Sequence, residues 1–124
     1  MQSELLYEKN KNMKTINRTV VSITPKKPYI DWANSFDDDG PKLYADTIHA
    51  TSFLIPENYD EYNYELFMKR NYKKIFEEEL SSWMQDPDVW PKNRDYNKFK
   101  RWFEIIPSDT VFELGKGPIV IEDY

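Results

Sequence analysis

The sequence predicts a small α+β domain in which helices pack on one face of a mainly antiparallel sheet of three to four strands. Segments 15–24, 47–55 and 104–114 are rich in β-branched residues and alternate in polarity, which is typical of strands. Segments 28–36, 60–86 and 95–103 repeat apolar residues three and four positions apart, which indicates amphipathic helices. A chain of 124 residues buries one core, and this order of elements favours an α+β arrangement.

The first elements follow from local sequence. Residues 1–14 are polar and rich in lysine, with Met13 as an alternative start, so we expect an N-terminal arm outside a domain that spans 15–114. Pro25 ends the first predicted strand, and Pro28 suits the first turn of a helix. One face of that helix carries Tyr29, Trp32, Ala33 and Phe36.

The segment from Ser35 to Asp46 partly resembles a calcium-binding loop. It has acidic residues at the third, fifth and twelfth positions and a glycine at the sixth, as such loops do. However, Ser35 occupies the first position, Lys42 occupies the usually apolar eighth, and no long helix precedes the segment. We therefore expect a solvated turn and no metal site.

The only histidine, His49, falls in the second predicted strand, 47–55, which Pro56 closes. Because the chain has no second histidine and no cysteine, it cannot build a tetrahedral zinc site from these ligands. We interpret His49 as structural or exposed, with catalysis or metal ligation as the alternative.

The central helical region is predicted to open near Asp60, where acidic residues suit a helix N-terminus, and to end at Asp86, before Pro87. One apolar face carries Tyr72, Ile75, Phe76, Leu80 and Trp83. Leu66 and Phe67 fall off this face when it is continued backward at about 100° per residue. We therefore expect a bend or break near Asn71.

Glu79 lies in the middle of that apolar face, four residues before Trp83. A buried carboxylate costs several kcal/mol unless it is paired or protonated. Arg94 is the nearest candidate partner in sequence, and its guanidinium can hold a carboxylate with two hydrogen bonds. The alternatives are a structural ion pair, a stripe edge at which Glu79 reaches water, and a functional carboxylate.

A second helix is predicted after Asp95, a good N-cap residue. Trp83, Trp90 and Trp102 are then expected to meet at one end of the core. Tryptophans in such a position fill a core more often than they line a ligand site.

The C-terminal third predicts a strand over 104–114 that is interrupted at Pro107–Asp109, with a bulge or hairpin. Gly115–Pro118 is a turn, too short and wrongly spaced for a phosphate loop. We interpret 115–124 as a C-terminal tail or an edge strand.

Composition excludes several classes of function. A net charge of −5 disfavours nucleic-acid and anionic-membrane partners. The absence of cysteine removes disulfides and thiolate chemistry. No long apolar run is present, so we expect neither a signal peptide nor a membrane span and assign a cytoplasmic location. No motif indicates a cofactor. Aromatic residues make up 16% of the chain, which predicts a core built largely from aromatic rings.

The sequence also resembles a small bacterial family of uncharacterised proteins. The likeness covers about Asn17 to Leu114. Its residues are Asn17-Arg18-Thr19, Thr24-Pro25-Lys26, Pro28-Tyr29-Ile30-Asp31-Trp32, Phe76-Glu77-Glu78-Glu79-Leu80, Trp83, Trp90-Pro91, Arg94 and Trp102-Phe103. The resemblance implies a bacterial cytosolic source and no particular chemistry.

Two main functional hypotheses follow, with a weaker third. The first is a non-enzymatic binding or protein-interaction domain, with a protein partner or self-association. Its contact surface comprises Trp83, Trp90 and Trp102, with Asp31 and Trp32 alongside. The second is a small carboxylate enzyme or small-molecule-binding protein with Glu79 as acid or base, Arg94 as anion clamp and Asp31 as orienter. An acidic mimic of nucleic acid is a third, weaker possibility, because the acidic residues are scattered.

Overall fold

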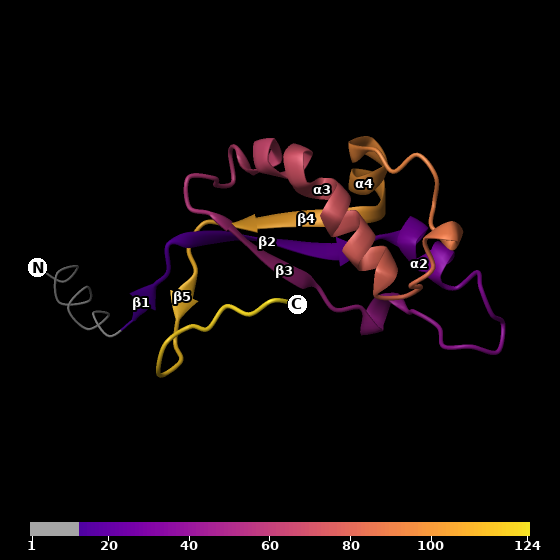
Figure 1. Ribbon diagram of the computed structural model, residues 1–124, viewed down its shortest axis with the longest axis horizontal. Helices are drawn as coiled ribbons and strands as arrows, with labels where there is room; N and C mark the ends of the chain where they lie inside the picture. Colours follow the sequence, from indigo (N-terminus) through magenta and orange to yellow (C-terminus); the bar gives the residue numbers. More distant parts are fainter. Residues whose placement is uncertain (1–12) are drawn as a thin grey trace, which may run out of the picture.

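The structure is a computed structural model that describes residues 13–124, so most of the predicted N-terminal arm lies outside the described residues (Figure 1). The helices and strands follow one another along the chain in a mixed order. They are β1 (Lys14–Thr15), β2 (Arg18–Pro25), α2 (Lys27–Ala33), the 3-10 helix η2 (Ala45–Thr47), β3 (Thr51–Pro56), α3 (Tyr64–Ser81), the 3-10 helix η3 (Pro87–Val89), α4 (Tyr96–Trp102), β4 (Phe103–Ser108) and β5 (Phe112–Glu113).

Two antiparallel sheets form, one of three strands in the order β3-β2-β4 and one of two strands, β1-β5. On the central strand β2, Val21 and Ile23 are fully buried under the helices, whereas Leu54 of β3 and Ile106 of β4 are exposed. The helices therefore cover one face of the three-stranded sheet (Figure 1), as the alternating side chains of an antiparallel sheet allow. The predicted α+β class is confirmed.

An aromatic layer joins the helices to the sheet. Phe76 of α3, Phe99 of α4 and Phe103 of β4 are essentially inaccessible to solvent, and their ring centroids lie 5.2–5.6 Å apart. Tyr29 of α2 contacts Phe103 at 5.3 Å and Trp102 at 6.3 Å. Tilted and edge-on pairs at these separations stabilise a core beyond the area that they bury.

The terminal strands differ from the prediction. The predicted strand 15–24 is divided between β1 and β2, and Ile16 N–H donates to the Val111 carbonyl (3.1 Å). The predicted strand 104–114 divides in the same way, because β5 leaves the main sheet to pair with β1, with Lys14 opposite Glu113. Pro107 lies within β4, an outer strand, where a missing N–H is tolerated. Residues 115–124 form a tail without helix or strand.

The second strand begins later than predicted, at Thr51, because Ala45–Thr47 forms the short helix η2. His49 is therefore exposed in the connection before β3 and not on the strand. The segment that resembled a calcium loop is an exposed turn in which Asp39 N–H donates to the Asp37 carboxylate (3.0 Å). The Lys42 ammonium donates to the Asp37 carbonyl (2.6 Å).

Helix α3 is continuous, and the predicted break at Asn71 is wrong. The helix begins at Tyr64 and not near Asp60, which precedes it in a turn. Phe67 lies off the main apolar face, but Tyr59 of the preceding turn covers it, with ring centroids 5.2 Å apart. The Asn71 side chain donates to the Phe67 carbonyl (2.8 Å) without ending the helix. Phe67 is therefore packed against Tyr59 although it lies off the main apolar face, and α3 needs no kink to cover it.

Candidate functional site

Glu79 is buried, as predicted, with 7% of its surface exposed. Its Oε1 atom is inaccessible and has no hydrogen-bond partner in the described part of the chain. The Glu79 main-chain carbonyl accepts from the Tyr29 hydroxyl (2.6 Å) and from Ser82 Oγ (2.7 Å). Two hydroxyl groups therefore bond to the Glu79 main-chain carbonyl, while the carboxyl group has no cationic partner among residues 13–124.

Burial raises the pKa of the Glu79 carboxyl group above its ordinary value. Desolvation is the largest cause. The Thr51 hydroxyl lowers this pKa in part and the neighbouring charge of Glu78 raises it, although no hydrogen bond of normal geometry joins Thr51 to the carboxyl group. Burial likewise raises the pKa of the Tyr29 hydroxyl to about 12. Both groups are thereby favoured in their neutral forms.

The predicted ion pair between Glu79 and Arg94 does not form. Arg94 Nη2 lies 3.7 Å from Glu77 Oε1, its Nη1 donates to the Pro91 carbonyl (2.9 Å), and its guanidinium lies 5.5 Å from the centre of the Trp90 ring. Two residues along a helix are about 200° apart around its axis, so Glu77 and Glu79 point to opposite sides of α3. Arg94 therefore stays at the outer side of the helix.

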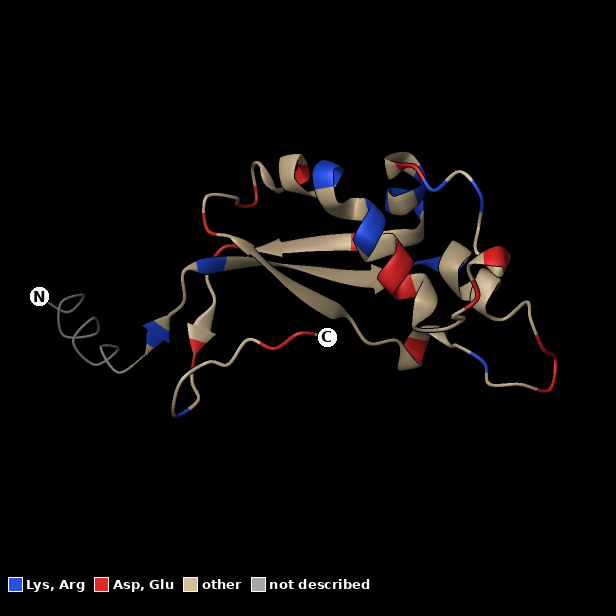
Figure 2. Cartoon of the chain, viewed as in Figure 1, with Lys and Arg blue, Asp and Glu red and all other residues tan. Residues whose placement is uncertain are grey.

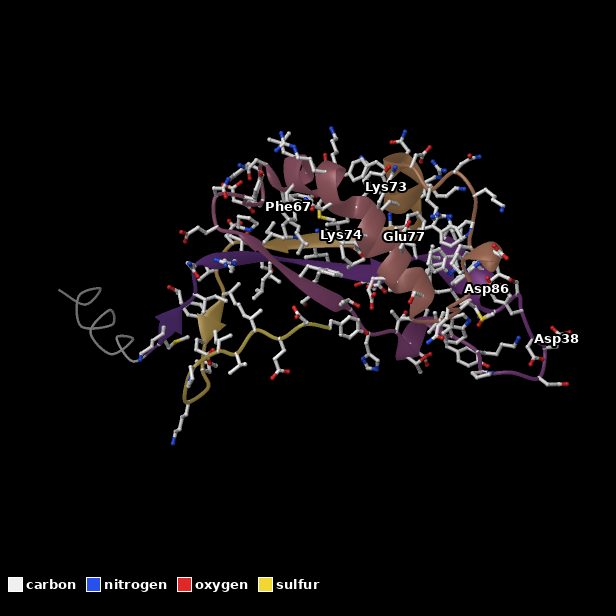
Figure 3. All side chains as sticks on the ribbon, in the orientation of Figure 1. Asp38, Phe67, Lys73, Lys74, Glu77 and Asp86 are labelled. Atoms are coloured by element: carbon white, nitrogen blue, oxygen red, sulfur yellow. The ribbon has the colours of Figure 1, made fainter. Side chains whose placement is uncertain are left out.

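Arg94 instead borders a polar cleft of about 330 Å³ with Lys73, Glu77, Lys92 and Asn93. Lys73 and Glu77 lie one turn apart on α3 (Figure 3). Asn93 has a φ of 54°, a left-handed conformation that asparagine tolerates better than most residues. The cleft holds three cationic side chains and one carboxylate.

Asp31 is also separate from Glu79. It lies on α2, where its carboxylate pairs with Lys27 one turn earlier (2.8 Å), and both side chains are largely exposed. Asp31 therefore cannot orient the Glu79 carboxyl group, and Glu79, Arg94 and Asp31 do not share one cleft.

The four tryptophans gather around α2. The indole N–H of Trp32 donates to the Val89 carbonyl (3.0 Å), that of Trp83 to the Ala33 carbonyl (2.7 Å) and that of Trp90 to the Met84 carbonyl (2.7 Å). Trp102 packs against Trp32, with ring centroids 6.2 Å apart. The Trp32 and Trp83 bonds fix α2 against the residues that follow α3, and the Trp90 bond closes the turn within those residues. The tryptophans at this end of the core therefore have a structural role.

An apolar cleft of about 410 Å³ opens beside these tryptophans. Phe36, Pro41, Trp83 and Met84 form its walls together with Ala33, Asp37 and Gly40. Phe36 is 37% exposed and meets Trp32 edge-on, with ring centroids 5.2 Å apart. We call these seven residues the apolar cleft.

Sequence reasoning identified Trp83 but missed Met84 and Pro41 as site residues. Phe36 was assigned to the buried face of the α2 segment, but the helix ends at Ala33 and leaves this ring at the surface. The early end of α2 at Ala33 is what exposes Phe36. The apolar spacing of the sequence continues to Phe36 and gives no sign of this end.

Comparisons with known proteins gave no match to a protein-family model, to a curated protein or to a solved structure. The resemblance to a bacterial family therefore stays a prediction, as does the cytoplasmic location. Within residues 13–124, no helix is long and apolar enough to cross a membrane. The same residues contain no group of three or more histidine, cysteine or acidic side chains placed to hold a metal ion.

Proposed function

We propose that the protein is a non-enzymatic interaction domain whose apolar cleft binds an apolar side chain of a protein partner. The observation that carries this proposal is the chemistry of the cleft walls. Phe36, Pro41, Trp83 and Met84 supply aromatic and flexible apolar surface, and methionine and aromatic residues are enriched in protein interfaces.

The cleft is also held in shape before a partner arrives. Trp83 is bonded to the Ala33 carbonyl and Trp90 to the Met84 carbonyl, so the side of the cleft formed by Trp83 and Met84 is tied to the fold. A preformed site loses less conformational entropy on binding than a flexible one. Asp37 is the only titratable residue in the cleft, which favours binding over acid-base chemistry at this position.

Selection of peptides from a displayed library on the immobilised protein tests the proposal. We expect selected peptides to share an apolar anchor and to bind at least about tenfold less well to Met84→Glu, because a carboxylate in the cleft must be desolvated. Leu66→Glu is the matched control, since Leu66 is 57% exposed on the distant part of α3. Peptides that bind both variants equally well would exclude the cleft.

A second candidate function is the binding of a small anion in the polar cleft at Arg94. Lys73, Lys92 and Arg94 place three positive charges in this polar cleft, although the net charge of the chain is −5. A melting-temperature shift with pyrophosphate tests this function, because a ligand of the native state raises the melting temperature. The shift should disappear in Arg94→Gln and persist in Arg101→Gln, whose side chain is exposed on α4.

A further inference from the structure

The strand β3 has a free edge. It is an outer strand of the three-stranded sheet, paired with β2 on one side only, and the described part of the chain supplies no strand to its other side. Along such an edge, half of the backbone N–H and C=O groups point outward and are available to a further strand. Natural proteins cover or charge such an edge to prevent unwanted pairing.

A groove of about 360 Å³ runs between this edge and α3. Phe53, Leu54 and Ile55 of β3 and Phe67 and Ile75 of α3 supply its apolar lining, and the remaining lining residues are Asn71, Lys74, Glu78 and Tyr124. Phe67 and Lys74 lie two turns apart on α3 (Figure 3). A free edge beside an apolar groove is the arrangement that binds an extended chain by strand addition.

The tail of this protein has the chemistry that such a groove accepts. Ile119, Val120 and Ile121 are β-branched, and Ile121 is 88% exposed. In an extended chain Ile119 and Ile121 point to the same side, so both can enter the groove. Glu122 and Asp123 follow, and they are opposite in charge to Lys74, the one cationic residue of the groove lining, which also contains the acidic Glu78. Figure 2 shows the acidic end of the tail and the basic residues of α3.

The same chain cannot place these isoleucines in its own groove without a large shift. Tyr124, the last residue of the tail, borders the groove beside Phe53 and Ile55 but is fully exposed to solvent. Ile119 and Ile121 are three to five residues upstream, about 10–17 Å away at the rise of an extended chain. The other end of the tail is held by the pairing of β5 with β1. The required occupant is therefore supplied more readily by a second molecule.

We propose that the protein self-associates by exchange of C-terminal segments, in which Ile119–Asp123 of one copy adds as an outer strand to β3 of a second copy. Ile119 and Ile121 occupy the groove, and Glu122 or Asp123 lies near Lys74. In a reciprocal exchange with two-fold symmetry, the free β3 edge of each copy pairs with the tail of the other. This surface is distinct from the apolar cleft, so the inference goes beyond the proposed function and does not depend on it.

Analytical ultracentrifugation across about two orders of magnitude in protein concentration tests the exchange. We expect the wild-type mass to rise from 15.0 kDa toward twice that value. Ile121→Asp should raise the dimer dissociation constant by about tenfold or more, because the new carboxylate would be desolvated in the groove. Val120→Asp, on the opposite side of the extended segment, is the matched control and should have a smaller effect.

Charge-reversal variants and amide hydrogen exchange complete the test. Lys74→Glu should weaken the dimer, and mixing this variant with Glu122→Lys, Asp123→Lys protein should restore association. Amides of Ile119–Ile121 should gain protection only at concentrations at which the dimer forms. A monomer at every concentration, a dimer that Ile121→Asp leaves unchanged, or protection that does not depend on concentration would each overturn the proposal. The last result would instead place the tail on its own β3.

Discussion

Replacement of Glu79 by glutamine is expected to stabilise the protein at neutral pH and to have little effect in acid. The side chain is 7% exposed, and no described residue offers a hydrogen bond to its Oε1. Burial, the largest cause, raises the pKa of the carboxyl group. The folded protein therefore holds this proton to a higher pH than the unfolded chain does.

The sign and size of the effect follow from this difference. Because the folded state binds the proton more tightly, the contribution of Glu79 to stability is fully present below the pKa of the unfolded chain, which is about 4.3 for glutamate. It is lost as pH rises through the raised pKa of the folded state, with a slope of at most about 1.4 kcal/mol per pH unit. An unsatisfied buried polar group costs about 1–3 kcal/mol and a charged one more. Glu79→Gln should therefore raise the free energy of unfolding by about 1–3 kcal/mol at pH values well above the pKa of the unfolded chain, where folding of the wild type has either to bind a proton or to bury the charge.

Urea denaturation followed by tryptophan fluorescence, repeated from acidic to weakly alkaline pH, measures this difference. Subtraction of the variant from the wild type isolates Glu79 from the other acidic residues. Glu104→Gln, at an exposed position of β4, serves as the control and should show a difference close to zero at every pH. If Glu79→Gln is less stable than the wild type at neutral pH, the carboxylate has a favourable partner in the folded state and the reasoning fails.

The same denaturation assay tests four further changes. Phe76→Ala should lower the free energy of unfolding by about 3–5 kcal/mol, because the ring is fully buried against three other aromatic side chains; a loss below about 1 kcal/mol would show that the layer is loosely packed. Tyr29→Phe removes the 2.6 Å hydrogen bond to the helix and should cost about 1 kcal/mol, whereas a neutral result would mean that the hydroxyl is bonded equally well in the unfolded chain. Asp95→Ala removes the cap that accepts from Lys98 N–H at 2.7 Å and should also cost about 1 kcal/mol, unless another group replaces the cap. Glu77→Gln should change stability by less than about 0.5 kcal/mol, because its 3.7 Å contact with Arg94 is half-exposed; a larger loss would indicate a stronger ion pair.

Features decided by local sequence were predicted well. Asp95 caps α4 as expected, because its carboxylate needs only the first turn of the following helix. The burial of Glu79 also followed from helical spacing, since α3 has to pack its apolar face on the sheet. The α+β class followed from segments with the spacing of apolar residues that is typical of helices and segments with the spacing that is typical of strands.

Features decided by tertiary contacts were not predictable from the same patterns. The partner of Arg94 depends on which side of α3 the following turn reaches. Because Glu77 and Glu79 are about 200° apart around the helix axis, the side that the turn reaches decides that Arg94 pairs with Glu77 and not with Glu79. The continuity of α3 at Asn71 depends on Tyr59, a residue outside the helix that covers Phe67. The pairing of β5 with β1 joins two strands of two residues each, which carry almost no periodic signal.

The central claim is that the apolar cleft, and not the pair of Glu79 and Arg94, is the surface that binds a partner. Chemical-shift mapping by NMR with a selected apolar-anchor peptide tests this claim most directly. Binding in the apolar cleft should place the largest shifts on the Met84 and Ala33 methyl groups and on the Phe36 ring. Shifts centred on Lys73 and Arg94, with the Met84 methyl group unchanged, would contradict it.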